Sequence, residues 1–91
     1  MVAKFPLGQV VATPGAMNAL HRAGQAPAFF VQKHQSGDWG EVCPGDAKLN
    51  DEALQEGGRL LSSYSTLRGE AIWIITEFDR SVTTLLLPSD Y

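Results

Sequence analysis

Apolar positions follow a helical period in the first half of the chain and a strand period in the second half. Residues 9–13 predict a short strand, and three helices are expected over 14–24, 27–37 and 44–58, each ending at a glycine. The residues on the inner stripes of the first two helices are Ala16, Ala19, Leu20, Ala23, Phe30, Val31 and His34.

Local signals mark where these helices begin. Thr13 and Pro14 are typical of an N-cap followed by the first helical residue, where the missing N–H of proline costs nothing. The third helix offers two capping residues, Asp46 and Asn50, and the sequence does not choose between them.

The second half is rich in β-branched and aromatic residues over 59–65, 71–77 and 82–87. These segments predict a three-stranded antiparallel meander with 71–77 in the middle. The expected order is β-α-α-α-β-β-β, a single α+β domain over 1–91 whose meander packs against the N-terminal helices. The middle strand carries Ala71, Trp73 and Ile75 on one face and Ile72 and Ile74 on the other.

A strand that is apolar on both faces requires cover on both sides of the sheet, and we expect Trp73 and Ile74 to be buried on opposite faces. The first two helices can cover one face. The other face is covered either by the segment 41–58 or by a second copy of the chain, and we expect a homodimer. The strand 82–87 is expected at the edge of the sheet, where Pro88 ends its pairing.

The composition of the chain argues against two classes of partner, nucleic acids and membranes. Ten acidic and seven basic residues among 91 give a net charge of −3, which disfavours direct binding of nucleic acid because phosphate contacts need a basic patch. The N-terminus lacks the apolar run of a signal peptide, and the longest apolar stretch is too short to span a bilayer, so we expect a soluble cytoplasmic protein and no membrane partner.

Neither a metal nor a cofactor is expected. His21, His34 and Cys43 follow no zinc-ligand spacing, and a single cysteine cannot form an internal disulfide. The nine glycines never assemble into a phosphate-binding loop and are typical of caps and turns.

The segment 33–42, KHQSGDWGEV, is the first candidate for a site. His34 and Asp38 could form an oriented imidazole pair for base catalysis. Alternatively, His34 satisfies the end of its helix, where a cation is favoured, and Trp39 anchors the loop on the core. We favour the second interpretation, because no serine or cysteine motif nearby supplies a nucleophile.

The turn 76–84 is the second candidate. Glu77, Asp79 and Arg80 crowd this turn and could form a solvated turn with a local ion pair. Alternatively, Arg80 and Tyr64 are exposed and meet a partner protein, since arginine and aromatic residues are enriched among interface hot spots. The candidate binding residues are therefore Asp38, Trp39, Asp79 and Arg80. If the chain is an enzyme, the alternative is a metal-independent nuclease or toxin-like enzyme that uses His34, Arg80 and Tyr64.

Four blocks of the sequence carry a family resemblance: FPLGQVVATPGA, SGDWGEV, GGRLLSSY and IWIITEFDRSVTTLLLPSDY. They resemble a family of small proteins, described as plasmid-related, that are carried on plasmids, integrative elements and gene cassettes. The resemblance covers nearly the whole chain, implies an accessory gene on mobile DNA, and carries over no site residue.

The order of elements also resembles, more loosely, the small toxins of type II toxin–antitoxin modules. Those toxins present several basic residues on the sheet to hold RNA, whereas only Arg59 and Arg80 could do so here, with Tyr64 or Tyr91 beside them. The acidic balance of the chain argues against this role.

The function we expect is that of a small acidic interaction protein that serves a mobile element and binds itself first. One version blocks a host defence complex, because an acidic surface can occupy a groove built for nucleic acid. The acidic residues available for such a surface are Asp38, Glu41, Asp46, Asp51, Glu52 and Glu56.

Overall fold

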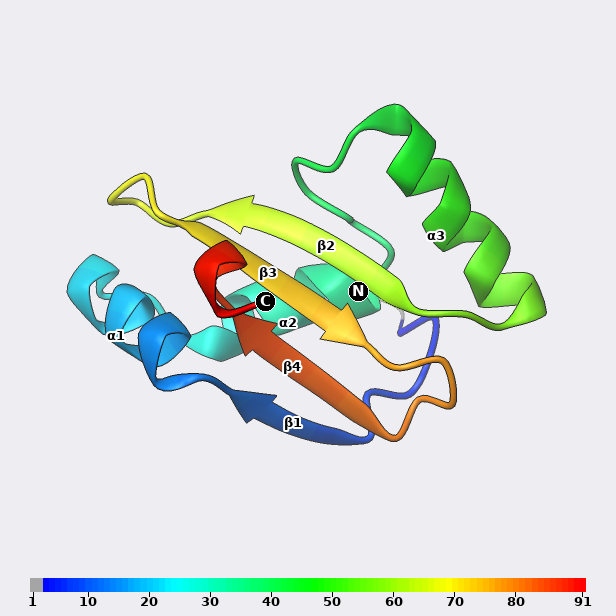
Figure 1. Ribbon diagram of the computed structural model, residues 1–91, viewed down its shortest axis with the longest axis horizontal. Helices are drawn as coiled ribbons and strands as arrows, with labels where there is room; N and C mark the ends of the chain where they lie inside the picture. The colour runs from blue at the N-terminus through cyan, green and yellow to red at the C-terminus, as the bar shows by residue number, and fades with distance from the viewer. Residues whose placement is uncertain (1–2) are drawn as a thin grey trace.

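The computed structural model describes residues 3–91 and confirms an α+β fold. Its elements, in chain order, are β1 (Gln9–Ala12), α1 (Pro14–Ala23), α2 (Pro27–Gln35), α3 (Pro44–Glu56), β2 (Leu60–Ser65), β3 (Ala71–Thr76), β4 (Val82–Leu86) and a short 3-10 helix, η1 (Pro88–Asp90). Figure 1 shows α2 passing behind the sheet, α3 beside β2, and η1 in front.

Each of the three α-helices begins with a proline in its first turn. The predicted cap of α1 is confirmed: Thr13 Oγ1 accepts a hydrogen bond from the N–H of Ala16 at 3.1 Å. The prediction for α3 is wrong, because its N-cap is Cys43, whose side chain makes no capping bond, and the helix begins before Asp46. Asn50 lies inside the helix and is buried.

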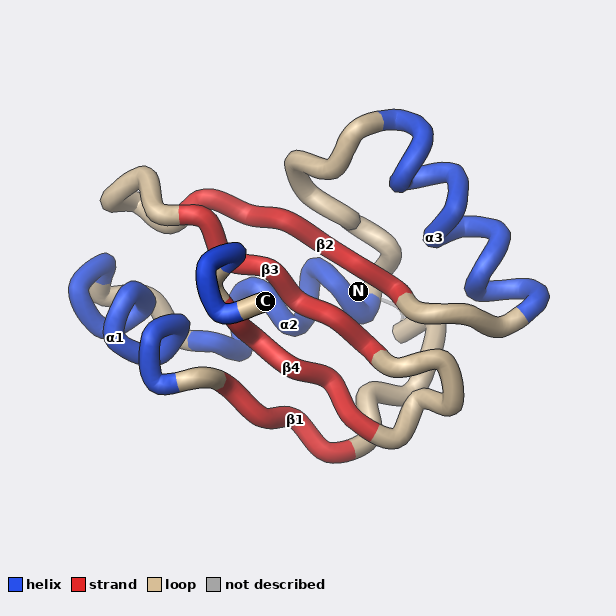
Figure 2. The backbone as a smooth tube through the Cα atoms, in the orientation of Figure 1, coloured by secondary structure: helices blue, strands red, loops and turns tan. Residues whose placement is uncertain are grey.

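The four strands form one sheet in the order β1-β4-β3-β2, visible as neighbouring red segments in Figure 2. The antiparallel meander with β3 in the middle is confirmed, since Ile74 pairs with Ser62 on one side and with Leu85 on the other. The predicted edge position of 82–87 is wrong. β1 pairs in parallel with β4, which makes β4 an interior strand and β1 the edge.

The opposite edge, along β2, is shielded by the chain itself. Asn50 of α3 donates to the carbonyl of Leu61 and accepts from its N–H, at 2.7 and 3.1 Å. Farther along the strand, Ser63 pairs with the loop before α3: its N–H donates to Trp39 and its carbonyl accepts from Glu41. These contacts occupy backbone groups that an edge strand would otherwise offer to another chain.

The two faces of the sheet differ in what covers them. Ile72, Ile74 and Leu85 are fully buried against α1 and α2, in one core cluster that also contains Phe30 and Tyr64. A second cluster joins α3 to the sheet; it consists of Phe5, Trp39, Ala53 and Leu60, with Leu7, Val42, Ala47 and Leu54 packed against it.

The other face, which we call the open face, is covered by no α-helix of residues 3–91; η1 and the C-terminus lie in front of it in Figure 1. Its residues alternate with those of the core, as predicted for Trp73 and Ile75. Burial of Trp73 is not borne out, because this side chain is only half-buried, whereas Ile74 is fully buried. Within residues 3–91, no helix is both long enough and apolar enough to cross a membrane.

Candidate functional site

His34 lies in the core beneath the sheet and is fully buried. Both ring nitrogens are hydrogen-bonded: Nδ1 lies 2.5 Å from Ser62 Oγ on β2, and Nε2 lies 2.9 Å from Thr76 Oγ1 on β3. Thr76 Oγ1 in turn lies 2.8 Å from Thr83 Oγ1 on β4. One imidazole thus ties α2 to three strands through side-chain hydroxyls.

The direction of these hydrogen bonds follows from their far end. Thr83 donates its only hydroxyl proton to the carbonyl of Leu7 at 2.8 Å, so it must accept from Thr76. Thr76 has then used its proton and must accept from Nε2–H of His34. The neutral ring therefore carries its proton on Nε2, and Ser62 donates to Nδ1.

The surroundings of His34 favour this neutral form. Burial, followed by the positive charge of Arg80, lowers the pKa of His34 to about 4. The predicted structural role of His34 is therefore supported by its contacts, but the predicted mechanism is wrong. The ring bonds to strand hydroxyls rather than to the carbonyls at the helix end, and its stabilising form is neutral rather than cationic.

Asp38 is engaged elsewhere. Its Oδ1 accepts from the N–H of Gly40 at 3.1 Å, and its backbone carbonyl accepts from the hydroxyl of Tyr64. Tyr64 is itself buried, and this burial raises its pKa to about 12. The proposed His34–Asp38 catalytic pair is thus replaced by two separate sets of structural hydrogen bonds.

Trp39 anchors the loop between α2 and α3 on the core, as expected. Its indole is 6% exposed, stacks near Phe5, and donates from Nε1 to Asp51 of α3 at 3.0 Å. Gly40 next to it has φ 75°, and a Cβ there would lie 2.1 Å from the carbonyl oxygen of Ser63. Only glycine fits this close approach, so the GDWG sequence is explained by packing.

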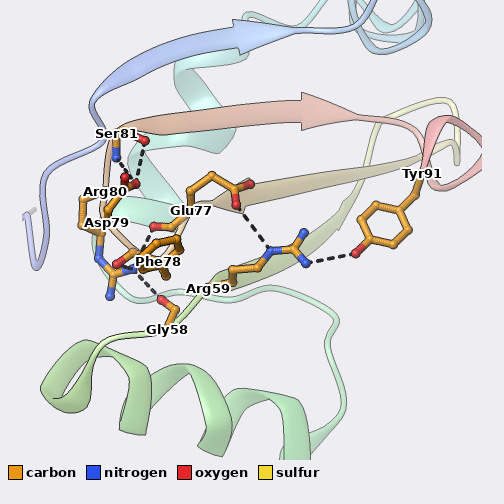
Figure 3. A network of polar contacts seen from close by, with 8 residues as sticks. All are labelled: Gly58, Arg59, Glu77, Phe78, Asp79, Arg80, Ser81 and Tyr91. Carbon is orange, nitrogen blue, oxygen red and sulfur yellow. Dashed lines mark hydrogen bonds and ion pairs between the residues drawn. The ribbon is translucent and has the colours of Figure 1, made fainter.

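Arg80 closes the C-terminal end of α3, as Figure 3 shows in part. From the β3–β4 turn its guanidinium donates to the carbonyls of Ala53, Gly58 and Glu77. α3 has no basic residue in its own last turn, so Arg80 supplies the cation that this end of a helix favours. Asp79 accepts from both the N–H and the hydroxyl of Ser81, and these bonds lower its pKa.

The three candidate catalytic residues are therefore held by the chain's own groups. His34 and Tyr64 are buried and hydrogen-bonded, and the guanidinium of Arg80 donates hydrogen bonds to backbone carbonyls. Among residues 3–91, no cluster of three or more His, Cys, Asp or Glu side chains could hold a metal ion. Every buried side-chain nitrogen or oxygen in this part of the chain has a hydrogen-bond partner.

Three of the six acidic residues over 38–56 also have internal partners. Asp38 accepts from Gly40, Asp51 from Trp39, and Glu41 from the hydroxyl of Ser65. The remaining three are exposed on α3: Asp46, Glu52 and Glu56. The acidic run is thus partly structural, and only half of it is free for a partner.

The open face contains a groove that the sequence did not reveal. Its volume is about 280 Å³, and it is lined by Leu61, Trp73, Ile75, Arg59 and Tyr91. The rings of Trp73 and Tyr91 meet edge-on, with centroids 5.9 Å apart. The apolar pattern of β3 predicted part of the lining, but Arg59 and Tyr91 come from opposite ends of the β2–η1 segment.

Arg59 lies at the rim of this groove, between Glu77 and Tyr91 in Figure 3. Its Nη1 donates to the hydroxyl of Tyr91 at 3.1 Å, and its Nε lies 3.8 Å from a carboxylate oxygen of Glu77. The Arg59 and Glu77 side chains are each nearly half exposed, so this ion pair is weak and open to exchange.

None of the family models, curated proteins or solved structures with which the chain was compared matches it. The resemblance to plasmid-related proteins consequently rests on the four sequence blocks alone.

Proposed function

We propose that this protein is a non-catalytic interaction module that binds another protein through the open face of its sheet. The observation that carries this proposal is an apolar groove on the face of the sheet that no α-helix of residues 3–91 covers. Leu61, Trp73 and Ile75 line it, and the side chain of Trp73 is only half-buried.

In an antiparallel sheet with one solvated face, that face is expected to carry polar side chains, so an apolar groove on it indicates a site that another molecule covers. A large apolar surface rimmed by polar groups is typical of an interaction site. The open face shows the same pattern on a small scale, because its groove is apolar and Arg59 and Glu77 lie at the rim. Tryptophan, tyrosine and arginine, which all line the groove, are also the residues most enriched among binding hot spots.

The resemblance to proteins of mobile elements supports the further proposal that this binding serves a mobile element, with a host protein complex as one partner. Binding of a host complex through the acidic residues over 38–56 has weaker support than binding through the open face. Half of these acidic residues accept hydrogen bonds from the chain itself. A nuclease is not proposed, since its three candidate residues are occupied by the chain itself.

Photo-crosslinking in expressing cells tests the proposal. A photoreactive amino acid at Val11, on the open face and 38% exposed, is compared with one at Met17, on α1 and 43% exposed. We expect discrete protein adducts from position 11 that disappear when Trp73→Thr is added, and none from position 17. Equal yields of adduct from both positions, or a yield from position 11 that Trp73→Thr does not change, would show that the open face is not the binding surface.

A further inference from the structure

The groove on the open face is large enough for one aromatic side chain. Its volume is about 280 Å³, whereas an apolar cavity of about 150 Å³ already accommodates benzene. Its walls are two aromatic rings, Trp73 and Tyr91, and two aliphatic side chains, Leu61 and Ile75. A third ring that packs edge-on against Trp73 or Tyr91 would add an aromatic contact to the burial of apolar surface.

Two unused hydrogen-bond donors lie side by side at the rim of this groove. Arg59 Nη1 donates to the hydroxyl oxygen of Tyr91 at 3.1 Å, and no group within residues 3–91 accepts the phenolic proton of Tyr91 itself. Within the same residues, Nη2 of Arg59 makes no hydrogen bond. Together the guanidinium and the hydroxyl can hold a carboxylate, whose two oxygens match the planar fork of an arginine.

Comparison with the other arginines shows that these unused donors are particular to the groove. Arg22 makes two hydrogen bonds to Glu70, at 2.6 and 3.2 Å, and Arg80 donates to backbone carbonyls. Arg68 lies on the exposed β2–β3 turn and does not line the groove. Arg59 is thus the arginine whose unused donors adjoin an apolar surface.

Glu77 limits the charge that the rim accepts. Its carboxylate lies 3.8 Å from Arg59 Nε, beyond hydrogen-bond distance, and both side chains are nearly half exposed. Glu77 therefore competes only weakly for Arg59. It would nevertheless repel a group with two negative charges, such as a phosphate, more strongly than a group with one. The anion that suits this rim is a single carboxylate.

The strand that carries Arg59 sets the spacing of the partner's side chains. Arg59 immediately precedes β2, Leu61 is two residues further on, and both line the groove. Side chains two residues apart in an extended chain point to the same side and are separated by about 7 Å. An extended segment laid along β2 would match this spacing if its aromatic and acidic residues were also two positions apart.

Resting on the proposed function, we propose that the groove binds an extended segment of the partner protein in which an aromatic and an acidic residue are separated by one position. The aromatic ring fills the apolar groove, and the carboxylate accepts hydrogen bonds from Arg59 and Tyr91. The residue between them points away from the sheet, so its identity is not selected.

Titration of the full chain with peptides, followed by the NMR signals of the two indole N–H groups, tests this proposal. The probe is a serine peptide with blocked ends that carries phenylalanine and, two positions later, glutamate. We expect a dissociation constant of about 1 mM. The peptide should shift the signal of Trp73 but not that of Trp39, which is buried and bonded to Asp51. Replacing its glutamate by glutamine, or its phenylalanine by alanine, should each weaken binding by about tenfold.

Substitutions in the protein separate this contact from a general attraction of negative charge. Arg59→Gln should abolish the preference for the glutamate peptide over the glutamine peptide. Arg68→Gln removes the same charge from the β2–β3 turn and should leave that preference unchanged. Glu77→Gln should strengthen binding of the glutamate peptide by about two- to threefold, because Arg59 loses its competing carboxylate. The altered side chains are exposed or nearly half exposed, so the fold should persist, which circular dichroism verifies.

Three results would overturn the inference: no shift of the Trp73 signal up to about 10 mM peptide, an altered peptide that binds as tightly as the original, or equal effects of Arg59→Gln and Arg68→Gln. The proposed function fails separately. If the glutamate and glutamine peptides bind equally but cellular adducts from position 11 still disappear with Trp73→Thr, the open face is the binding surface and its partner has a different chemistry.

Discussion

Acidification should destabilise this protein well above the pH at which most carboxylates titrate, and His34 is the reason. The ring is fully buried, accepts from Ser62 at Nδ1 and donates to Thr76 from Nε2. A second proton would have to bind Nδ1, which would force Ser62 to reverse its hydroxyl and leave a charge in the core. The unfolded chain binds that proton without such a cost.

The sign and size of the effect follow from the two pKa values. The folded-state pKa of His34 is about 4, below the ordinary value of 6.5, so the unfolded state binds more protons between these limits and stability falls as the pH decreases. The shift corresponds to about 3 kcal/mol in total, present above the ordinary pKa and lost by about pH 4. Small domains have a free energy of unfolding of roughly 5 kcal/mol at the low end of the usual range, so this loss would remove much of their stability.

Urea unfolding followed by tryptophan fluorescence, repeated from about pH 7 to about pH 4, measures this loss. In His34→Gln the part of the pH dependence that belongs to His34 should vanish. The variant should also be less stable at neutral pH by about 1–3 kcal/mol, because the strand hydroxyls lose their partner. His21→Gln, on the exposed side of α1, keeps His34 and should retain the wild-type curve. If wild type and His34→Gln differ by the same free energy at every pH, the buried-ring argument is refuted.

Four further substitutions test the fold, each by chemical denaturation. Ile74→Ala should cost about 2–5 kcal/mol because Ile74 is fully buried, whereas Trp73→Ala should cost less because that ring is only half-buried; equal losses would contradict the open face. Arg80→Gln should lower stability by about 1–3 kcal/mol, since carbonyls at the end of α3 lose their donor, and a wild-type midpoint would show that the cap is dispensable. Gly40→Ala should abolish the pairing with β2, because its Cβ would lie 2.1 Å from the carbonyl oxygen of Ser63; a variant as stable as wild type would contradict that close approach.

The parts of the fold that the sequence predicted are those with local signals. Thr13 and Pro14 predict the start of α1, because the N-cap hydrogen bond joins two residues that are only three positions apart. The start of α3 could not be predicted in this way, because Cys43 gives no side-chain signal at the N-cap. Asn50, a good capping residue, instead forms its side-chain hydrogen bonds with Leu61 of β2.

Pairings between distant segments could not be predicted in this way. β1 joins β4 across more than seventy residues, and nothing in its four residues specifies that neighbour. The hydrogen-bond partners of His34 could not be predicted for the same reason. The apolar stripe of α2 correctly placed His34 inward, but its partners Ser62 and Thr76 lie on strands where an isolated hydroxyl is indistinguishable from a solvent-facing residue.

The hydrogen-bonded side chains beneath the helices, His34, Thr76 and Thr83, and the apolar groove on the open face both depend on the register of the strands. Hydroxyls in a core add little net stability, but each has one satisfactory geometry, so His34, Thr76 and Thr83 fix how α2 sits on the sheet. A one-residue slip of a strand would turn its hydroxyl toward solvent and leave a nitrogen of His34 unpaired. The hydroxyls on the helix-covered side of the sheet thus help to specify the register, and because side chains alternate, that register holds Trp73 and Ile75 together on the other side. The binding surface proposed here depends on this fixed register, because Leu61, Trp73 and Ile75 of its groove are positioned by the strands that carry them.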